Sequence, residues 1–185
     1  GNYSDGRHPD SIEFCDARRD AERRDFTVNA LFMDPDTNEV IDYVNGLNDL
    51  ESRCIRAVGD PELRFQEDHL RLLRAVRFSA QLDFEIEADT YAALSTGPSR
   101  LAKISPERIQ NELRRILTQP RSASAIRTLY DTGLLATFLP EFIDTVGCEQ
   151  PPQFHPEGDV FTHTLLMLDH LESPSFTLAM GALLH

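Results

Sequence analysis

The chain has 185 residues, of which 41% are hydrophobic, and its 18 basic and 31 acidic side chains give a formal net charge of −13 at pH 7. This composition is typical of one or two globular domains and excludes a low-complexity tail. No run approaches the roughly 18 consecutive apolar residues of a membrane span, and the first residues carry no apolar signal segment. We therefore expect a cytoplasmic protein with no membrane partner. Because an acidic chain repels polyanions, RNA could be held only by a local basic patch.

The first sixty residues predict a small α+β unit. Short strand-like runs alternate with turns, and the segment 34–38, Asp-Pro-Asp-Thr-Asn, is typical of a hairpin turn. The strand-like runs are 12–15, 31–33, 40–44 and 54–58. From Pro61 onward the pattern becomes helical with no further clear strand, so we place a boundary near residues 59–61.

The rest of the chain shows helical periodicity. The strongest pattern predicts a helix from about Glu67 to Leu82. Its apolar stripe is Leu72, Leu73, Val76 and Ala80, and its charged face is Glu67, Asp68, Arg71 and Arg74. A second helix is expected after Ser105, with Pro106 at its first position, and a third ends at Gly133. Further helices are predicted at 161–171 and 176–185. The predicted fold is α+β at 1–60, followed by all-α units at 61–120 and 121–185.

The segment 23–30, Arg-Arg-Asp-Phe-Thr-Val-Asn-Ala, carries residue types that suit a nucleotide. A guanidinium presents a planar fork of donors that matches phosphate oxygens. Asp25 and Asn29 could bond a ribose hydroxyl or orient the arginines. The alternative is a salt-bridged start of a helix, with Asp25 near the positive end of the helix dipole.

Asp68 and Arg71 form a second candidate site. They stand three residues apart, so on a continuous helix they would be neighbours. The carboxylate would accept a hydrogen bond from the exocyclic amine of cytosine or adenine, while the guanidinium donates to the ring nitrogen or carbonyl beside it. Uracil and guanine place a carbonyl where the amine should be and would be rejected. The alternative is an exposed ion pair that contributes little to stability.

Weaker patterns follow in the second half of the chain. Glu107 and Arg108 are expected to belong to a stabilising charge network on the second helix. The histidines of the last segment are of metal-ligand type, but too few ligands are present to close a site. They are His155, His163 and His185. A set of basic residues could track RNA phosphates or form a solvated helix face, and the sequence leaves both open. They are Arg100, Lys103, Arg108, Arg114, Arg115 and Arg121.

In this order, the segments closely resemble the class II (bacterial-type) tRNA nucleotidyltransferase and poly(A) polymerase family over nearly the whole chain. The matching segments are 23–30, 42–50, Ile-Arg-Ala-Val-Gly-Asp-Pro at 55–61, 64–78 with its opening Arg-Phe-Gln-Glu-Asp, and Ser-Pro-Glu-Arg-Ile at 105–109. The stretch 155–163, with the final Ala-Leu-Leu-His, resembles the opening of an HD-type domain. The resemblance implies a partial nucleotidyltransferase head, a helical neck that recognises the base, and a helical body.

The resemblance also implies an activity: transfer of CMP or AMP from CTP or ATP to the 3′ end of tRNA, as in CCA addition, or addition of poly(A) to RNA. Carried over by position, it implies nucleotide-binding roles for six residues and supporting roles for three. The nucleotide-binding residues are Arg24, Asp25, Asn29, Asp68, Arg71 and Arg74, and the supporting residues are Glu67, Glu107 and Arg108. In the loop 42–50, which would link head and neck, Asn45 replaces a glycine common in the family.

The family's chemistry uses a pair of aspartates that bind two Mg²⁺ ions. Asp5, Asp10 and Asp16 are too scattered to supply this pair. We therefore expect a fragment that lacks the metal ligands, assign it no catalytic residue, and expect it to be inactive alone. Two alternatives stay open: a nucleotide- or RNA-binding helical module without catalysis, and an HD-type phosphohydrolase whose metal site is completed beyond residue 185.

Overall fold

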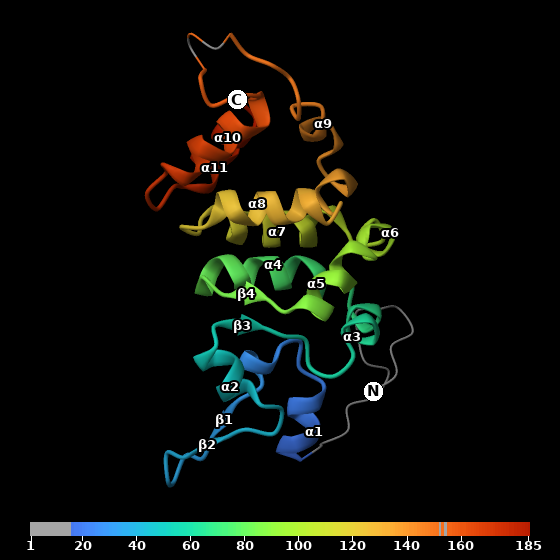
Figure 1. The fold of residues 1–185 in the computed structure, drawn as a ribbon. Coiled ribbons are helices and arrows are strands. Elements are labelled where there is room, and N and C mark those ends of the chain that lie inside the picture. Colours follow the sequence, from blue (N-terminus) through green and yellow to red (C-terminus); the bar gives the residue numbers. More distant parts are fainter. Residues whose placement is uncertain (1–15, 152, 154) are drawn as a thin grey trace.

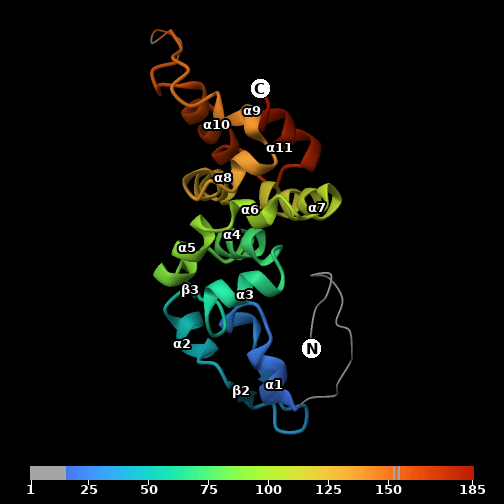
Figure 2. The same cartoon turned by 90° about the vertical axis from the view of Figure 1, so that its right-hand side faces the viewer.

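The computed structural model describes residues 16–151, 153 and 155–185. The molecule is an elongated stack whose elements follow one another nearly in chain order (Figures 1 and 2). Helix α1 (Ala17–Glu22) and a small hairpin lie at one end, and helices α10 (Val160–Asp169) and α11 (Phe176–Leu183) lie at the other. No helix in the described part of the chain is long and apolar enough to cross a membrane.

The hairpin predicted around residues 34–38 is confirmed. Strands β1 (Phe32–Met33) and β2 (Val40–Ile41) pair antiparallel. The Asp34 carboxylate accepts hydrogen bonds from two backbone N–H groups of the turn, at 2.8 and 3.1 Å, which is the local bonding that makes Asp a turn residue. Both strands are shorter than predicted, and the strand-like run 12–15 lies outside the described residues.

A second strand pair corrects the expectation that no strand follows Pro61. Strand β3 (Cys54–Ile55) pairs in parallel with β4 (Glu85–Ile86), which lies in the predicted all-helical region. A strand of two residues is too short to show an alternating pattern, and its partner is far away in the sequence. The α+β fold class is confirmed.

The helix predicted from Glu67 to Leu82 is interrupted near its start. The structure has α3 (Pro61–Glu67) and α4 (Arg71–Leu82), with Asp68 between them in an extended conformation at φ −145° and ψ 107°. The Asp68 carboxylate accepts a hydrogen bond from the N–H of Leu70 at 3.1 Å. Such local side-chain bonding competes with helix continuation. The predicted apolar stripe on α4 is nevertheless buried.

The other predicted helices are present with small shifts at their ends. Helix α7 (Pro106–Leu117) follows Ser105, and α8 (Ser122–Asp131) is followed by Gly133 at φ +74°. The remaining elements are short: η1 (Thr27–Asn29), α2 (Gly46–Glu51), α5 (Ala88–Ser95), α6 (Pro98–Leu101), η2 (Leu135–Thr137) and α9 (Pro140–Ile143). One hydrophobic cluster runs from Phe26 to Leu183 and joins the stacked layers.

The loop 42–50 enters helix α2, as expected. Asn45, at the position where the family commonly has glycine, adopts the left-handed conformation at φ 63°. Asparagine tolerates this region better than most residues. The Asp42 carboxylate accepts hydrogen bonds from the N–H groups of Val44, Gly46 and Leu47 at 2.9 to 3.0 Å. Gly46 packs so closely on η1 that a Cβ there would collide with the carbonyl oxygen of Thr27.

A buried ion pair joins α4 to α7. The Nε of Arg77 donates to Glu112 at 2.8 Å, and the two residues are only 7% and 4% exposed. Removing one partner of such a pair leaves an uncompensated buried charge, whereas replacing both with apolar residues is often tolerated.

This pair generates a stability prediction. Glu112→Leu should lower the free energy of unfolding by about 3 kcal/mol because Arg77 stays charged and buried. The double substitution Arg77→Leu with Glu112→Leu should recover most of that loss. Urea denaturation of the parent, both single variants and the double variant measures the coupling. Additive effects of the two single substitutions would contradict the assignment.

Candidate functional site

An open cavity of about 310 Å³ lies where the segment after α1, η1, the α3–α4 junction and α7 meet. It is lined by Arg23, Arg24, Asp25, Asn29, Asp68, Leu70, Arg71, Arg74 and Arg108. We call this the arginine-lined cavity. Five guanidiniums against two carboxylates give its walls an excess of positive charge, which favours an anionic ligand. Its volume is within the range of small-molecule sites, which is about 300–1,000 Å³.

Asp25 is the buried acid of this cavity, at 5% exposure. One carboxylate oxygen accepts hydrogen bonds from the Phe26 N–H and the Asn29 amide, both at 3.0 Å, and the other accepts from Nε of Arg74 at 2.7 Å. Burial alone would raise the pKa of Asp25, but the Arg74 charge and these hydrogen bonds outweigh it, so the pKa is lowered. Asp25 is therefore a charged group that fixes Arg74 and Asn29 in the wall.

Arg23 and Arg24 follow the end of a helix, which corrects the alternative that they form a salt-bridged helix start. Arg23 is the C-cap of α1. Both guanidiniums bind Asp20, with Nε distances of 2.6 Å from Arg23 and 3.1 Å from Arg24. The hydrogen bond from Arg24 lowers the pKa of Asp20. Asp20 thus holds both arginines at the rim, where they remain largely exposed.

Asp68 and Arg71 are not neighbours on a helix surface, because the helix is interrupted between them. The carboxylate of Asp68 pairs instead with Nη2 of Arg108 from α7, at 3.3 Å. Arg71 is turned toward α1 and α3 and is 12% exposed. Both side chains still line the arginine-lined cavity. The prediction that Asp68 and Arg71 belong to one site is therefore supported, but the continuous helix on which it was based is wrong.

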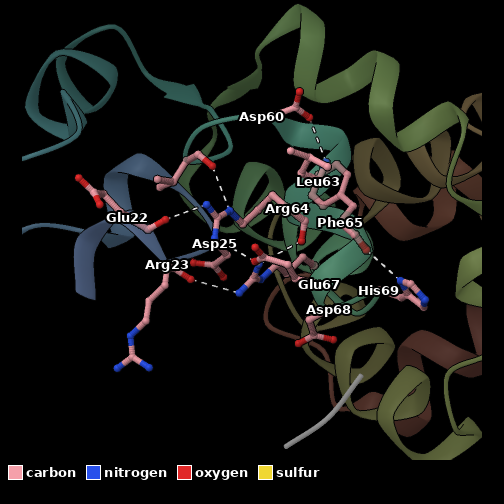
Figure 3. Close-up of polar contacts among 12 residues, drawn as sticks. Glu22, Arg23, Asp25, Asp60, Leu63, Arg64, Phe65, Glu67, Asp68 and His69 are labelled. Atoms are coloured by element: carbon pink, nitrogen blue, oxygen red, sulfur yellow. Dashed lines mark hydrogen bonds and ion pairs between the residues drawn. The ribbon is translucent and has the colours of Figure 1, made fainter. Parts of the chain in front are cut away.

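Arg64, Glu67 and Arg71 form a clamp between the α3–α4 junction and the end of α1. Figure 3 labels Arg64 and Glu67 near Glu22 and Arg23. Nη2 of Arg64 donates to the Glu22 carbonyl at 2.7 Å, and Nη2 of Arg71 donates to the Arg23 carbonyl at 3.2 Å. Both guanidiniums also bind Oε2 of Glu67, at 2.9 and 2.7 Å. The last carbonyls of a helix have no intrahelical partner, so the clamp satisfies them and orients the arginines that follow α1.

The six predicted nucleotide-binding residues all line the arginine-lined cavity, as does the supporting residue Arg108. Glu67 lies beside it in the clamp. Glu107 is exposed on α7 and is not among the lining residues, so its supporting role stays a prediction. Two further lining residues had no individual role assigned. Arg23 belongs to the segment 23–30 that was predicted to suit a nucleotide, whereas no sequence signal pointed to Leu70.

The arginines of the basic set are engaged with partners within the chain. Arg100 pairs with Glu62, Arg108 with Asp68, Arg115 with Glu112 and Arg121 with Asp83, and Arg114 lies over the Phe176 ring. Such pairing fits a charged helix surface, and Arg114, Arg115 and Arg121 are also exposed. RNA contact by this set stays a prediction.

Two family models match separate segments of the chain. The model "Poly A polymerase head domain" matches residues 1–56, and the model "Probable RNA and SrmB-binding site of polymerase A" matches residues 83–145. The CCA-adding enzyme of Lactobacillus johnsonii is 49% identical over 133 residues, which are 71% of this chain and 33% of that protein. The CCA-adding enzyme of Levilactobacillus brevis is 47% identical over 143 residues, or 77% of this chain and 36% of that protein. The chain thus spans about a third of the length of these curated relatives.

Solved structures give the same result. The Bacillus stearothermophilus CCA-adding enzyme in complex with CTP aligns with a TM-score of 0.68 and 29% identity, over 92% of this chain and 47% of that one. The Thermotoga maritima CCA-adding enzyme complexed with tRNA aligns with a TM-score of 0.62 and 25% identity, over 90% of this chain and 44% of that one. From its sequence segments, its fold and these matches, the chain belongs to the tRNA nucleotidyltransferase and poly(A) polymerase family.

Proposed function

We propose that this chain is the nucleotide-selecting part of an enzyme that transfers CMP and AMP from CTP and ATP to the 3′ end of tRNA. The observation that carries the proposal is that one positively charged cavity gathers all six residues to which the resemblance gives nucleotide-binding roles. CTP and tRNA complexes of CCA-adding enzymes share the fold, and the curated relatives support CCA addition over poly(A) synthesis.

The two sides of the arginine-lined cavity suit different parts of a nucleotide. Arg23 and Arg24 are exposed guanidiniums at the rim, and they suit the triphosphate because they can exchange Asp20 for phosphate oxygens. Asn29, held through Asp25, offers an amide to the ribose. Across the cavity, the Asp68 carboxylate is 30% exposed and supplies the acceptor that the amines of cytosine and adenine require.

Arg71 and Arg108 divide the task that was predicted for Arg71 alone. Arg71 donates to backbone carbonyls and Glu67 and is nearly covered. Arg108 lies against the Asp68 carboxylate and is 29% exposed. We therefore assign base reading to Asp68 with Arg71 beside it in the lining, and we assign Arg108 the role of orienting the Asp68 carboxylate.

The metal-dependent step needs donors other than those of the arginine-lined cavity. The nucleotidyltransferase family generally uses a divalent metal, which we take to be Mg²⁺, an ion that prefers uncommitted carboxylate oxygens. Asp25 is committed to Arg74 and Asp68 to Arg108. Within residues 16–151, 153 and 155–185, the lining of this cavity does not fit a Mg²⁺ pair. Its residues bind and orient the nucleotide.

A second candidate function is nucleotide binding without transfer. The engagement of both cavity carboxylates with arginines favours it for this chain in isolation. Incorporation of labelled CMP into a tRNA that lacks its terminal CCA separates the two: transfer by the chain supports the enzyme, and binding without transfer supports the module.

Base selection gives the first prediction on this site. In calorimetric titration with Mg²⁺ present, the folded chain should bind CTP and ATP at least tenfold more tightly than UTP and GTP. Asp68→Asn should remove the preference, because an amide can donate to the carbonyls of uracil and guanine. The matched control Asp144→Asn, at an exposed position beyond α9, should keep it. Equal binding of all four nucleotides by the parent chain would rule out base reading by this cavity.

The buried acid gives a prediction on pH. Since the pKa of Asp25 is lowered from its ordinary value of 3.8, its ionised form contributes stability above that value, and this contribution is lost as pH falls through the folded-state pKa. Asp25→Asn should therefore reduce the free energy of unfolding at pH 7 by about 2 kcal/mol, because Arg74 loses its buried partner. The deficit should shrink below about pH 4.

Urea denaturation between pH 7 and pH 3 checks this expectation, with Asp36→Asn in the exposed β1–β2 turn as the matched control. A deficit of constant size over the whole range would show that Asp25 does not stabilise the fold through its charge.

A further inference from the structure

Phe78 is an aromatic side chain of α4, the helix in the middle of the stack (Figure 1), and it is not one of the residues that line the arginine-lined cavity. Residues four apart on a helix are neighbours. The guanidinium of Arg74 accordingly lies over the Phe78 ring, with its Cζ 5.3 Å from the ring centroid. An arginine in this position is attracted by the negative face of the ring. Phe78 therefore contacts a cavity-lining arginine without lining the cavity itself.

The Phe78 ring is itself held by two neighbours. The buried ring of Phe26 lies 5.7 Å away between centroids at an interplanar angle of 72°, which is the edge-to-face arrangement that aromatic pairs prefer. The guanidinium of Arg77 lies over the same ring, with its Cζ 4.1 Å from the centroid. Arg77 is fixed in turn by its buried pair with Glu112 and by a hydrogen bond to Gln81 at 3.0 Å. The ring is therefore a fixed surface.

These contacts close a circuit at the cavity wall. The backbone N–H of Phe26 donates to one oxygen of the adjacent Asp25 carboxylate at 3.0 Å. Nε and Nη2 of Arg74 both bind the other oxygen, Oδ2. Because these two nitrogens share a single oxygen, the ion pair alone allows the guanidinium to swing about that atom. The Phe78 ring lies against the guanidinium and restricts its tilt. Among the described residues, Nη1 of Arg74 is paired with no acceptor, so this nitrogen can donate to a ligand.

We propose that Phe78 is a positioning residue of the nucleotide site and that its ring sets the plane of the Arg74 guanidinium. The inference rests on the proposed function, which gives Arg74 a nucleotide-binding role. A donor that is already oriented binds its ligand more tightly, because less freedom is lost on binding. Base reading is assigned to Asp68, which Phe78 does not orient. Phe78 should therefore set the affinity for CTP and ATP alike and leave the preference over UTP and GTP unchanged.

The test changes the electrons of the ring while it nearly keeps the shape of the ring. Phe78 is replaced by mono-, di- and trifluorinated phenylalanine, because fluorine withdraws electron density from the ring face and weakens its attraction for a cation. In calorimetric titration, the affinity for CTP should fall with each fluorine and reach a loss of about fivefold in the trifluorinated chain. The ratio of CTP to UTP affinity should stay constant. Circular dichroism establishes that every variant is folded.

A second measurement needs no nucleotide. The Nε–H resonance of Arg74, assigned by its loss in Arg74→Lys, should exchange with solvent faster as fluorines are added, because the hydrogen bond to Asp25 is held less firmly. The matched control is the same fluorinated series at Phe161, a buried ring that also lies under an arginine, with Cζ of Arg127 4.5 Å from its centroid. Fluorination of Phe161 should change neither CTP affinity nor the Arg74 resonance.

Two results would overturn the proposal. One is a fluorinated series at Phe78 in which CTP affinity and the Arg74 exchange rate both stay at the parent values. The other is a loss of CTP affinity of the same size when the series is repeated in Arg74→Met, since Phe78 would then act on the fold and not through Arg74. A parent chain that binds no CTP, with Arg74 exchange that still follows the fluorine series, would instead refute the proposed function and with it the nucleotide role of Phe78.

Discussion

The arrangement of the arginine-lined cavity depends on the contact between the end of α1 and the α3–α4 junction. The last carbonyls of a helix are unpaired and carry the negative end of its dipole. Arg64 and Arg71 donate to these carbonyls at Glu22 and Arg23 and are themselves joined by Glu67. The residues that follow α1 are thereby fixed against the start of α4, where Arg74 reaches Asp25. This contact and the Arg74–Asp25 ion pair together fix one wall of the cavity against the other.

The interruption of the helix at Asp68 brings α7 to the same cavity. In a continuous helix its side chain would lie on the helix surface, whereas the extended backbone places the carboxylate between α4 and Arg108 of α7. One residue that leaves the helix therefore brings a third element to the cavity. The continuous hydrophobic cluster behind α4, α7 and α8 then holds these walls together.

Most of the helices, the hairpin turn and the family could be predicted from the sequence, because local sequence signals determine local structure. The turn at 34–38, Pro106 after Ser105 and Gly133 after α8 each gave the correct element, and the order of segments gave the family. The interruption at Asp68 could not be read from periodicity, since Leu72 to Ala80 keep one stripe whether or not the helix begins earlier. The partners of Asp68 and Arg71 depend on residues distant in sequence, namely Arg108 and Arg23. Strand β4 was missed for the same reason.

The affinity of the Arg64→Lys chain for CTP tests the central claim most directly. Arg64 does not line the cavity, and lysine keeps its charge but cannot reach the carbonyls of Glu22 and Val58 and the Glu67 carboxylate with one planar fork. If the clamp orients the cavity walls, calorimetric titration under conditions where the variant is fully folded should show CTP bound about tenfold more weakly, a loss of about 1.4 kcal/mol. The control Arg53→Lys, at an exposed position, should bind as the parent does. An unchanged affinity in Arg64→Lys would contradict the account.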